Sequence, residues 1–563
     1  MKKKIIFVFG LIIFLGIAFD ASADSVSETR FFYTDASYDL NARSKIEAIL
    51  VKITPRAYFY VDKTWWSNVS QDKVYQYLSI LEQEFENNIY PVLTSTFGSE
   101  IKPGIDKDLR ITVLMHPMVN GAGGYFRSND EYSKVQVSDS NEREMVYINS
   151  DYIATDLAKS LLAHEFVHLI TFNQKENSAG IAEDIWLNEA RAEYAPTLLG
   201  YDNIYEGSNL QKRVKIFSED PTDSIVEWSY LKKDYGSVSM FIHYLVDHYG
   251  VKILIDSLHS SKAGIESINY ALEENSFSQD FSQIFNDWVI AVLVNNCSYG
   301  DKYCYLDKNL KNFHLTGRIN FLPISGESSL TFADFTRKWQ GNWYKIIGGT
   351  DTLEVKFNCR PGVGFKLPYI TQNSAGNYNI RFLDLGKNCS GDFAVESFGN
   401  DVTALYLIPL ATDYVSDNSA FYPFSWTVSI KKNQNDADII EKLLTQIAQL
   451  EAEIANIQAR IILILAGKET PAISGDCFSI NSNLYYGLKN QNVACLQQFL
   501  KLQGSDIYPE GLITGYFGSL TRTAVIRFQE KYASEILSPL GLNTGTGYVG
   551  LSTRAKINNL LTN

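Results

Sequence analysis

Histidine, cysteine and basic residues are scarce in this sequence. Only seven His and six Cys occur among 563 residues, and 50 Lys and Arg stand against 64 Asp and Glu, for a net charge of −14. Such an acidic chain should repel phosphate backbones, so we expect no nucleic acid among its partners. Beyond the N-terminus, no apolar run is long enough to span a membrane. With so few His, a close pair of them is informative about function.

The remaining composition is typical of folded domains. Hydrophobic residues make up 45% of the chain and charged residues 20%, which excludes a mainly disordered or fibrous protein. Aromatic residues reach 13%, which favours sheet-rich domains. The length predicts three or four domains.

The N-terminus has the pattern of a secretory signal peptide. Three Lys precede an apolar run at residues 5–19, and the small residues Ala21-Ser22-Ala23 follow. The run is shorter than the roughly 20 residues that a spanning helix needs, so an uncleaved anchor is the weaker alternative. We predict cleavage near Ala23 and a secreted or cell-envelope location.

Cysteine usage agrees with export. No C-x-x-C motif occurs, which argues against the alternative of a metal cluster. In an oxidising compartment, pairing between sequence neighbours is the simplest arrangement. The predicted disulfides are Cys297–Cys304, Cys359–Cys389 and Cys477–Cys495.

Changes in pattern along the chain predict a multidomain protein. After the signal peptide at 1–23, strand-like runs precede helical ones, which indicates an α+β domain at 24–310. Short alternating runs separated by turn residues predict a β-sandwich at 311–432. We interpret this predicted β-sandwich as an accessory domain, and carbohydrate binding is an alternative role. A heptad segment at 433–470 and a small helical domain at 471–563 complete the chain.

The heptad segment predicts a coiled coil. Apolar residues recur at alternating spacings of three and four, at Ile440, Leu443, Ile447, Leu450, Ile454, Ile457, Ile461 and Ile464. Ile at one core position, with Leu443 and Leu450 followed by two Ile at the other, favours a parallel homo-oligomer, a dimer before a trimer. The alternative is one amphipathic helix packed against a neighbouring domain.

The motif that carries chemistry is H-E-x-x-H at His164, Glu165 and His168, inside an apolar helical run. On a helix, positions i and i+4 share a face, so both imidazoles can bind one Zn²⁺. Glu165 can then accept a proton from the attacking water. The alternative is two His packed in a core helix.

A third protein ligand must come from elsewhere. Thr171 and Gln174 stand where a metzincin needs Gly and His, which excludes that class. The acidic candidates downstream are Glu176, Glu183, Asp184, Glu189 and Glu193. Glu189 and Glu193 lie four apart on a predicted helix, so one can bind metal while the other supports a ligand His. A solvated acidic helix face is the alternative.

The H-E-x-x-H motif followed by W-L-N-E-A-x-A-E-Y at 186–194 resembles the gluzincin zinc metallopeptidases, and in particular secreted bacterial enzymes of the hyicolysin-like type. The resemblance covers roughly residues 45–300. It implies an α+β gluzincin-type fold with one catalytic Zn²⁺. In its terms His164, His168 and Glu189 are the zinc ligands and Glu165 is the general base. Glu193 would hold a ligand imidazole in orientation.

Gluzincins also use a downstream Tyr or His to stabilise the oxyanion. On that resemblance we select Tyr235, which begins a predicted helix, with Tyr230 and His243 as rivals. A further hypothesis is that the segment Gly124-Tyr125-Phe126 pairs with extended substrate by strand addition.

The C-terminal residues form a second recognisable pattern. Two predicted helices and a closing segment carry it, with Val493, Leu496-Gln497 and Leu500, then Tyr516-Phe517-Gly518, Thr521, Ala524-Val525 and Phe528-Gln529, and finally Gly547, Val549-Gly550 and Thr553. These residues resemble the peptidoglycan-binding module, a small three-helix domain, over residues 477–563. This region holds seven basic and four acidic residues, the opposite balance to the whole chain. The resemblance implies peptidoglycan as a partner, and the charge would suit anionic wall material.

Together these features predict a secreted zinc endopeptidase that hydrolyses peptide bonds in proteins and is tethered to the cell envelope. One alternative keeps the metal but makes peptidoglycan stem peptides the substrate. Another is a catalytically inert wall-binding scaffold, against which the intact H-E-x-x-H with Glu189 and Glu193 argues.

Overall fold

The computed structural model describes residues 24–323, 327–412, 421–430, 443–447, 450, 454 and 479–562. The chain divides into two compact units, residues 1–448 and 449–563. The predicted signal peptide at 1–23 and most of the predicted coiled coil at 433–470 lie outside the described residues. In the described part of the chain, no helix has the length and apolarity needed to cross a membrane.

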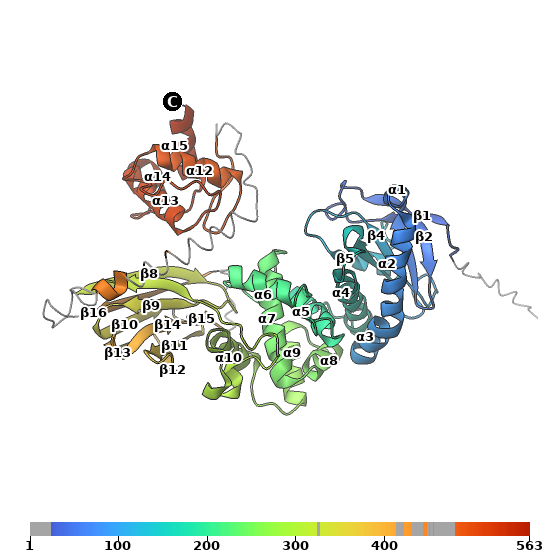
Figure 1. Ribbon diagram of the computed structural model, residues 1–563, viewed down its shortest axis with the longest axis horizontal. Helices are drawn as coiled ribbons and strands as arrows, with labels where there is room; N and C mark the ends of the chain where they lie inside the picture. Colours follow the sequence, from blue (N-terminus) through green and yellow to red (C-terminus); the bar gives the residue numbers. More distant parts are fainter. Residues whose placement is uncertain are drawn as a thin grey trace, which may run out of the picture. The chain divides into compact units, whose positions relative to one another are not determined.

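The first unit begins with a sheet of six strands in the order β1-β2-β3-β4-β6-β5 (Figure 1). The strands are β1 (Thr29–Tyr33), β2 (Lys45–Ile53), β3 (Ala57–Asp62), β4 (Ile111–His116), β5 (Gly124–Phe126) and β6 (Met145–Asn149). β3, β4 and β6 run parallel and are buried along their whole length, as expected for strands covered on both faces. β5 pairs antiparallel with β6 at the sheet edge.

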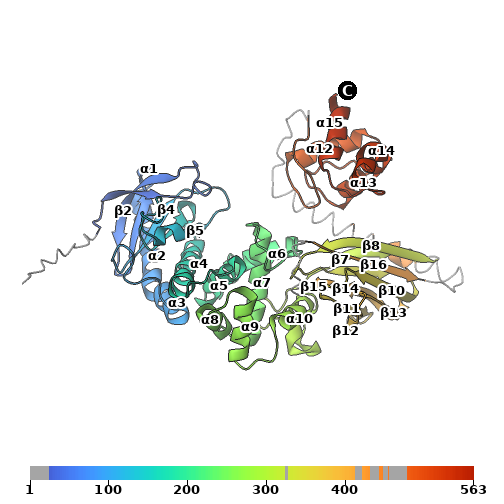
Figure 2. The same cartoon turned by 180° about the vertical axis from the view of Figure 1, so that it is seen from behind.

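Helices follow these strands in the chain. They are α1 (Lys63–Ser67), α2 (Gln71–Glu84), α3 (Tyr90–Phe97), α4 (Leu157–Thr171), α5 (Ile185–Leu198), α6 (Asn209–Glu219), α7 (Lys232–Tyr249), α8 (Lys252–His259), α9 (Gly264–Glu274) and α10 (Phe281–Val294). Figures 1 and 2 show α4 beside the sheet, with α5 between it and the later helices. Strands thus precede helices, and the predicted helix that carries Glu189 and Glu193 is confirmed by α5.

α4 is buried because it is apolar nearly all round. Leu162, Phe166 and Val167 are fully covered in the main core, and Phe166 stacks on Tyr90 of α3 at 5.4 Å between ring centroids. A helix apolar on most faces must lie inside a domain. This packing leaves the side that carries its two histidines toward α5.

The next part of the first unit consists of strands. These are β7 (Arg318–Leu322), β8 (Ser328–Thr336), β9 (Tyr344–Gly348), β10 (Asp351–Cys359), β11 (Phe365–Asn373), β12 (Tyr378–Leu383), β13 (Ser390–Phe398), β14 (Val402–Leu407), β15 (Leu410–Ala411) and β16 (Tyr422–Ile430). One group runs β8-β16-β10-β13 and the other contains β12, β11, β14, β9 and β7. Among the described residues the groups are joined by the single pair Phe398↔Val402. Val355 and Trp426 of one group share a core with Ile346 and Leu405 of the other.

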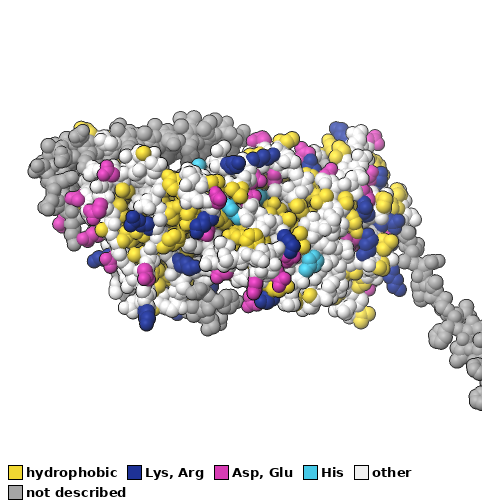
Figure 3. Space-filling view, turned by 90° about the horizontal axis from the view of Figure 1, so that it is seen from below, with side chains coloured by type: hydrophobic (Ala, Val, Ile, Leu, Met, Phe, Trp, Pro, Cys, Tyr) yellow, Lys and Arg dark blue, Asp and Glu magenta, His cyan; other side chains and the backbone are white. Residues whose placement is uncertain are grey.

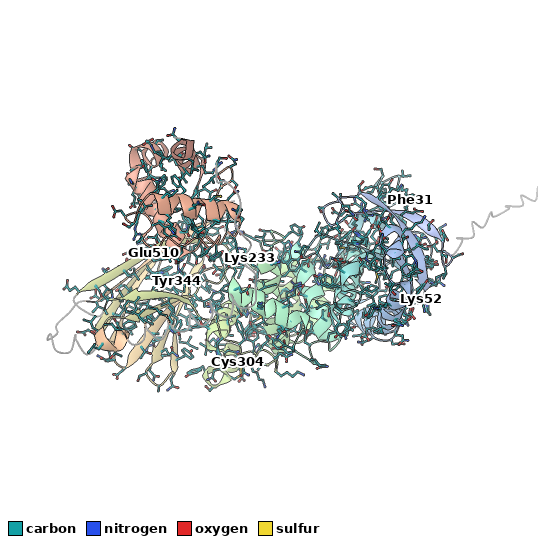
Figure 4. The ribbon with its side chains drawn as sticks, turned by 45° about the horizontal axis from the view of Figure 1, so that its top comes forward. Phe31, Lys52, Lys233, Cys304, Tyr344 and Glu510 are labelled. Carbon is teal, nitrogen blue, oxygen red and sulfur yellow. A yellow bond between two sulfur atoms is a disulfide. The ribbon has the colours of Figure 1, made fainter. Side chains whose placement is uncertain are left out.

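The strand region shares a core with the helices. Trp343 Nε1 donates to the carbonyl oxygen of Val289 in α10 at 2.8 Å, and the Trp339 ring packs on Phe281 and Phe285. The predicted boundary at 310 therefore crosses one continuous core. Figure 4 labels Tyr344 within the strand region and Cys304 near the end of α10.

Two of the three predicted disulfides are confirmed, Cys297–Cys304 and Cys359–Cys389. The third involves Cys477, which lies outside the described residues. On the face drawn in Figure 3, acidic and basic side chains are interspersed, so the net negative charge is not gathered into one patch there.

The second unit is a small helical domain. Its helices are α12 (Gln491–Leu502), α13 (Ser519–Lys531), α14 (Ala533–Ile536) and α15 (Leu551–Thr562). α14 is a single short turn, so the described part contains three longer helices. Leu496, Phe499, Val525 and Phe528 form its core.

Candidate metal centre and wall-binding domain

The structure brings both histidines of α4 together with Glu189 of α5. The two Nε2 atoms of His164 and His168 are 3.2 Å apart. Glu189 Oε2 lies 3.3 Å from His164 Nε2 and 3.7 Å from His168 Nε2. Among the described residues, this is the one group of three His, Cys, Asp or Glu whose ligand atoms all lie within 4.8 Å of one another.

The donor set fits a zinc ion. Ligand atoms about 2.0–2.1 Å from Zn²⁺ in a tetrahedron are about 3.3–3.4 Å apart, close to the spacings here. The Nδ1 of His168 is 3.0 Å from Asn188 Oδ1, and that of His164 is 3.4 Å from Glu193 Oε1. Protons on both Nδ1 atoms leave three lone pairs converging on one point. Glu189 Oε2 is buried without a hydrogen-bond partner, which a cation would resolve.

Glu165 lies beside this group, against the edge strand. The Glu165 side chain is buried, and a Cβ added to Gly124 of β5 would lie 2.8 Å from Glu165 Oε1 and 2.6 Å from the Tyr147 carbonyl oxygen. Only glycine allows this close approach. Burial, together with the charges of Glu189 and Glu193, raises the pKa of Glu165 to about 8, although His164 opposes the shift.

Glu193 is held by α6. Arg213 Nε donates to Glu193 Oε2 at 2.7 Å, and Asn209 Nδ2 donates to the same oxygen at 3.0 Å. Burial would raise the pKa of Glu193, but the charge of Arg213 and its hydrogen bond lower it. Glu193 therefore stays ionised beside His164. Sequence reasoning missed Arg213 and Asn209, because no local signal links α6 to α5.

A cleft of about 620 Å³ opens onto these residues. Its lining includes His164, Glu165, His168, Asn188, Glu189, Gly124, Tyr125, Phe126, Tyr230 and Tyr235. Tyr235 lies in the first turn of α7. The Arg213 guanidinium covers its ring, 4.8 Å from the ring centroid. Burial raises the pKa of Tyr235, so its hydroxyl remains a donor.

The rival residues are placed differently. Tyr230 lines the cleft with a left-handed backbone, at φ 58°, so both tyrosines remain candidates. His243 is buried away from the cleft and bonds to Thr197 Oγ1 at 2.8 Å and the Ser239 carbonyl oxygen at 2.7 Å.

The other acidic candidates for the third ligand do not join the metal group. Glu183 accepts from Arg191 Nη1 at 2.7 Å and from the Gly264 amide at 2.8 Å, which is a structural role. Neither Glu176 nor Asp184 belongs to the group of ligand atoms.

Part of the cleft lining comes from the loop between β1 and β2, which sequence reasoning also missed. Asp35, Ser37 and Tyr38 line the cleft. The Tyr38 ring lies 4.7 Å from that of Tyr125, and the Asp35 amide donates to the Tyr125 hydroxyl at 3.2 Å. Burial and the charges of Glu165 and Glu189 raise the pKa of Tyr38.

Two glutamines organise the second unit. Gln497 Nε2 donates to the Tyr516 carbonyl oxygen at 2.8 Å, and Gln529 Nε2 donates in the same way to Tyr548 at 2.8 Å. Each buried amide thus holds one tyrosine-bearing turn. The Tyr548 ring is 43% exposed and lies nearly parallel to the half-exposed ring of Tyr485, with 6.2 Å between centroids.

Comparison with known proteins identifies this second unit. Residues 489–557 match the family described as "Putative peptidoglycan binding domain". The C-terminal part of the chain is therefore a peptidoglycan-binding domain, which supports association with the cell wall. Together with the disulfides, this agrees with an extracellular or cell-envelope location.

The remaining comparisons are weak. No curated protein matches the chain. The periplasmic g-type lysozyme inhibitor PliG of Aeromonas hydrophila is 15% identical over 21% of this chain and 100% of its own, with a TM-score of 0.15. The GH115 4-O-methyl-α-glucuronidase BtGH115A is 8% identical over 58% of this chain and 52% of its own, with a TM-score of 0.13. At these TM-scores neither similarity indicates fold or function.

Proposed function

We propose that this protein is a zinc-dependent endopeptidase attached to the cell wall through its C-terminal domain. The observation that carries the proposal is the convergence of three possible ligand atoms, from His164, His168 and Glu189, beside the buried carboxyl of Glu165. The first three residues would hold the ion. When bound, Zn²⁺ polarises the scissile carbonyl and increases the acidity of water.

The chain's own residues supply the proton transfers. Glu165 accepts a proton from the attacking water and later delivers it to the leaving amine nitrogen. Tyr235 donates a hydrogen bond to the oxyanion of the tetrahedral intermediate. Glu193, kept ionised by Arg213, orients the His164 ring through Nδ1. The edge strand β5 lines the cleft, where its backbone is available to an extended peptide.

The direct test measures zinc content and cleavage of an unfolded protein substrate, with and without a chelator. We expect about one zinc per chain and chelator-sensitive hydrolysis. A zinc-free protein that still cleaves the substrate would contradict the proposal, and so would a zinc-loaded protein that cleaves nothing.

A second candidate substrate is the stem peptide of peptidoglycan. It is favoured by the peptidoglycan-binding domain, which would hold the enzyme on that polymer. Release of peptides from purified sacculi, lost in Glu165→Gln, would support it. Hydrolysis of unfolded protein alone would favour the first candidate.

The wall attachment is tested by co-sedimentation with insoluble peptidoglycan. Exposed aromatic rings are common binding surfaces for such polymers, so we expect Tyr548→Ala to weaken binding several-fold while the domain stays folded. Tyr201→Phe, which alters a tyrosine of the first unit, serves as the control. Full binding after deletion of residues 477–563 would contradict a tether in this domain.

A further inference from the structure

Four acidic side chains gather at one end of the N-terminal sheet, and we call them the acidic cluster. Glu100 and Asp106 lie between α3 and β4, Glu131 ends a short helical turn after β5, and Glu144 directly precedes β6. Glu100, Glu131 and Glu144 are only 1%, 6% and 2% exposed. None of these residues belongs to the metal centre described above.

The buried oxygens of this cluster lack partners. Both carboxylate oxygens of Glu131 are buried without a hydrogen-bond partner, and so is Oε2 of Glu144. The other oxygen of Glu144 accepts from the Ile105 amide at 2.8 Å. That contact, and the closeness of Gly104 to the same carboxylate, ties the turn containing Asp106 to the start of β6.

The nearby cations do not pair with Glu131 or Glu144. Arg143 binds Asp24 at 2.6 Å and reaches Asp106 only at 3.8 Å. Arg127 pairs with Asp130 and Asp139, and Lys102 is 3.8 Å from Glu100. Within the described ranges, no Lys, Arg or His forms an ion pair with Glu131 or Glu144.

Burial without counter-charge is unfavourable for a carboxylate. Burial and the charges of Glu144, Asp130 and Asp106 raise the pKa of Glu131 well above its ordinary value, although the nearby Met145 amide opposes the shift. Burial likewise raises the pKa of Glu144 to about 7. The cluster therefore gains either from protons or from a cation.

We propose that Glu131 and Glu144 bind a divalent cation, Ca²⁺ in preference to Zn²⁺ or Mg²⁺. Carboxylate oxygens without nitrogen or sulfur are the ligands of a hard cation. No third acidic group of the cluster is close enough to both glutamates to complete a group of three ligand atoms like that of the zinc-type site. Coordination completed by backbone carbonyls and water is common for Ca²⁺ and suits such a pair.

Such a cation would connect the segment carrying Glu131 with the segment carrying Glu144. The first leads directly from β5, whose residues line the cleft, and the second enters β6, the pairing partner of β5. Ca²⁺ would thus support the cleft wall without touching the catalytic residues. The bound Ca²⁺ would therefore increase the stability of the fold.

The test uses the full chain carrying Glu165→Gln, so that self-digestion does not contribute. The protein is stripped of metal, reloaded with one equivalent of Zn²⁺ and titrated with Ca²⁺ to about 10 mM, while Tm is recorded. For an extracellular-type site with Kd of about 10⁻⁴–10⁻³ M, Tm should rise by roughly 5 °C. Tb³⁺ luminescence excited through tyrosine measures occupancy independently of stability.

Matched variants assign the response to the cluster. Glu131→Gln and Glu144→Gln should each abolish most of the rise in Tm and the Tb³⁺ signal. Glu142→Gln should keep both, because Glu142 is exposed and pairs with Lys134 at 3.0 Å. In the Ca²⁺-free protein, Glu131→Gln should raise Tm, which would also show that this variant folds.

Three results would overturn the proposal. One is a parent protein whose Tm and Tb³⁺ signal do not respond to the titration. Another is a response that survives in both Gln variants. The third is a rise in Tm for Ca²⁺-free Glu131→Gln with no effect of Ca²⁺ on the parent, which would mean that protons alone neutralise the pair.

Discussion

Two groups of buried carboxylates in the first unit differ in whether the protein supplies them with hydrogen-bond donors and a counter-charge. Glu193 receives hydrogen bonds from Arg213 and Asn209, and these partners keep its pKa low. Glu131 is equally buried but has no such partner, and its pKa is raised. The difference shows that burial alone does not reveal the role of an acid. A carboxylate neutralised by the protein's own cations orients its neighbours, whereas an oxygen left without a partner, as in Glu189 and Glu131, is available to an external cation.

The largest effect is expected at Glu165, the proposed catalytic base. Glu165→Gln removes the proposed proton acceptor but none of the three proposed metal ligands. We expect kcat on unfolded protein to fall by about 10²–10⁴, with zinc content unchanged. Glu176→Gln, which changes an acid outside the cleft, should retain activity. Undiminished hydrolysis by Glu165→Gln would show that the base is assigned wrongly.

Removing the carboxylate of Glu189, whose Oε2 has no hydrogen-bond partner, should weaken zinc binding. Glu189→Ala takes away one of the three proposed ligands, so zinc affinity should fall by more than the about 10–100-fold typical of an outer-shell change. Competition with a chromophoric chelator measures this, with Glu176→Ala as the control. Equal zinc affinity in the two variants would exclude Glu189 as a ligand.

The contrast between Glu193 and Glu131 can be removed by taking away the counter-charge of Glu193. Arg213→Met leaves Glu193 buried without its counter-charge, which should lower the free energy of unfolding by about 3–5 kcal/mol. Urea unfolding measures the loss. The double variant Glu193→Gln/Arg213→Met should recover much of it, because no isolated charge remains. A double variant as unstable as the single one would mean that Arg213 acts through packing on Tyr235.

In the acidic cluster, the stability contributed by a glutamate should depend on pH with the opposite sign to that of an acid with a counter-charge, such as Glu193. Glu144 ionises near 4.5 in the unfolded chain and at about 7 in the folded one. Between these values the folded protein holds more protons, so its stability should fall as pH rises, by about 1–3 kcal/mol. Zinc binding also varies with pH, so the quantity to compare is the difference between Glu144→Gln and its parent in Ca²⁺-free buffer.

The difference in the free energy of unfolding between Glu144→Gln and its parent should narrow toward low pH, where Glu144 is protonated in both the folded and the unfolded chain. Saturating Ca²⁺ should reverse the trend in the parent. A pH-independent difference would show that Glu144 does not titrate in this range.

Much of the fold could be predicted where the signal is local. Helix and strand positions such as α5 and β4 follow from short-range periodicity, and the disulfide Cys297–Cys304 closes a short loop. The wall of the cleft formed by the β1–β2 loop was not predicted. Its residues are distant in sequence from α4, and no periodic pattern marks them. Assignment of the first domain to the gluzincin fold remains a prediction.

The sequence by itself determined that His164 and His168 share one helix face, because i, i+4 geometry depends only on the backbone. It also indicated the peptidoglycan-binding domain, through apolar helix positions and short motifs such as Tyr516-Phe517-Gly518. The tertiary structure decided which acid joins the two histidines, which one is neutralised by Arg213, and which oxygens at Glu131 and Glu144 stay unpartnered. These outcomes depend on contacts between segments far apart in the chain, and such contacts are set by packing of the whole core.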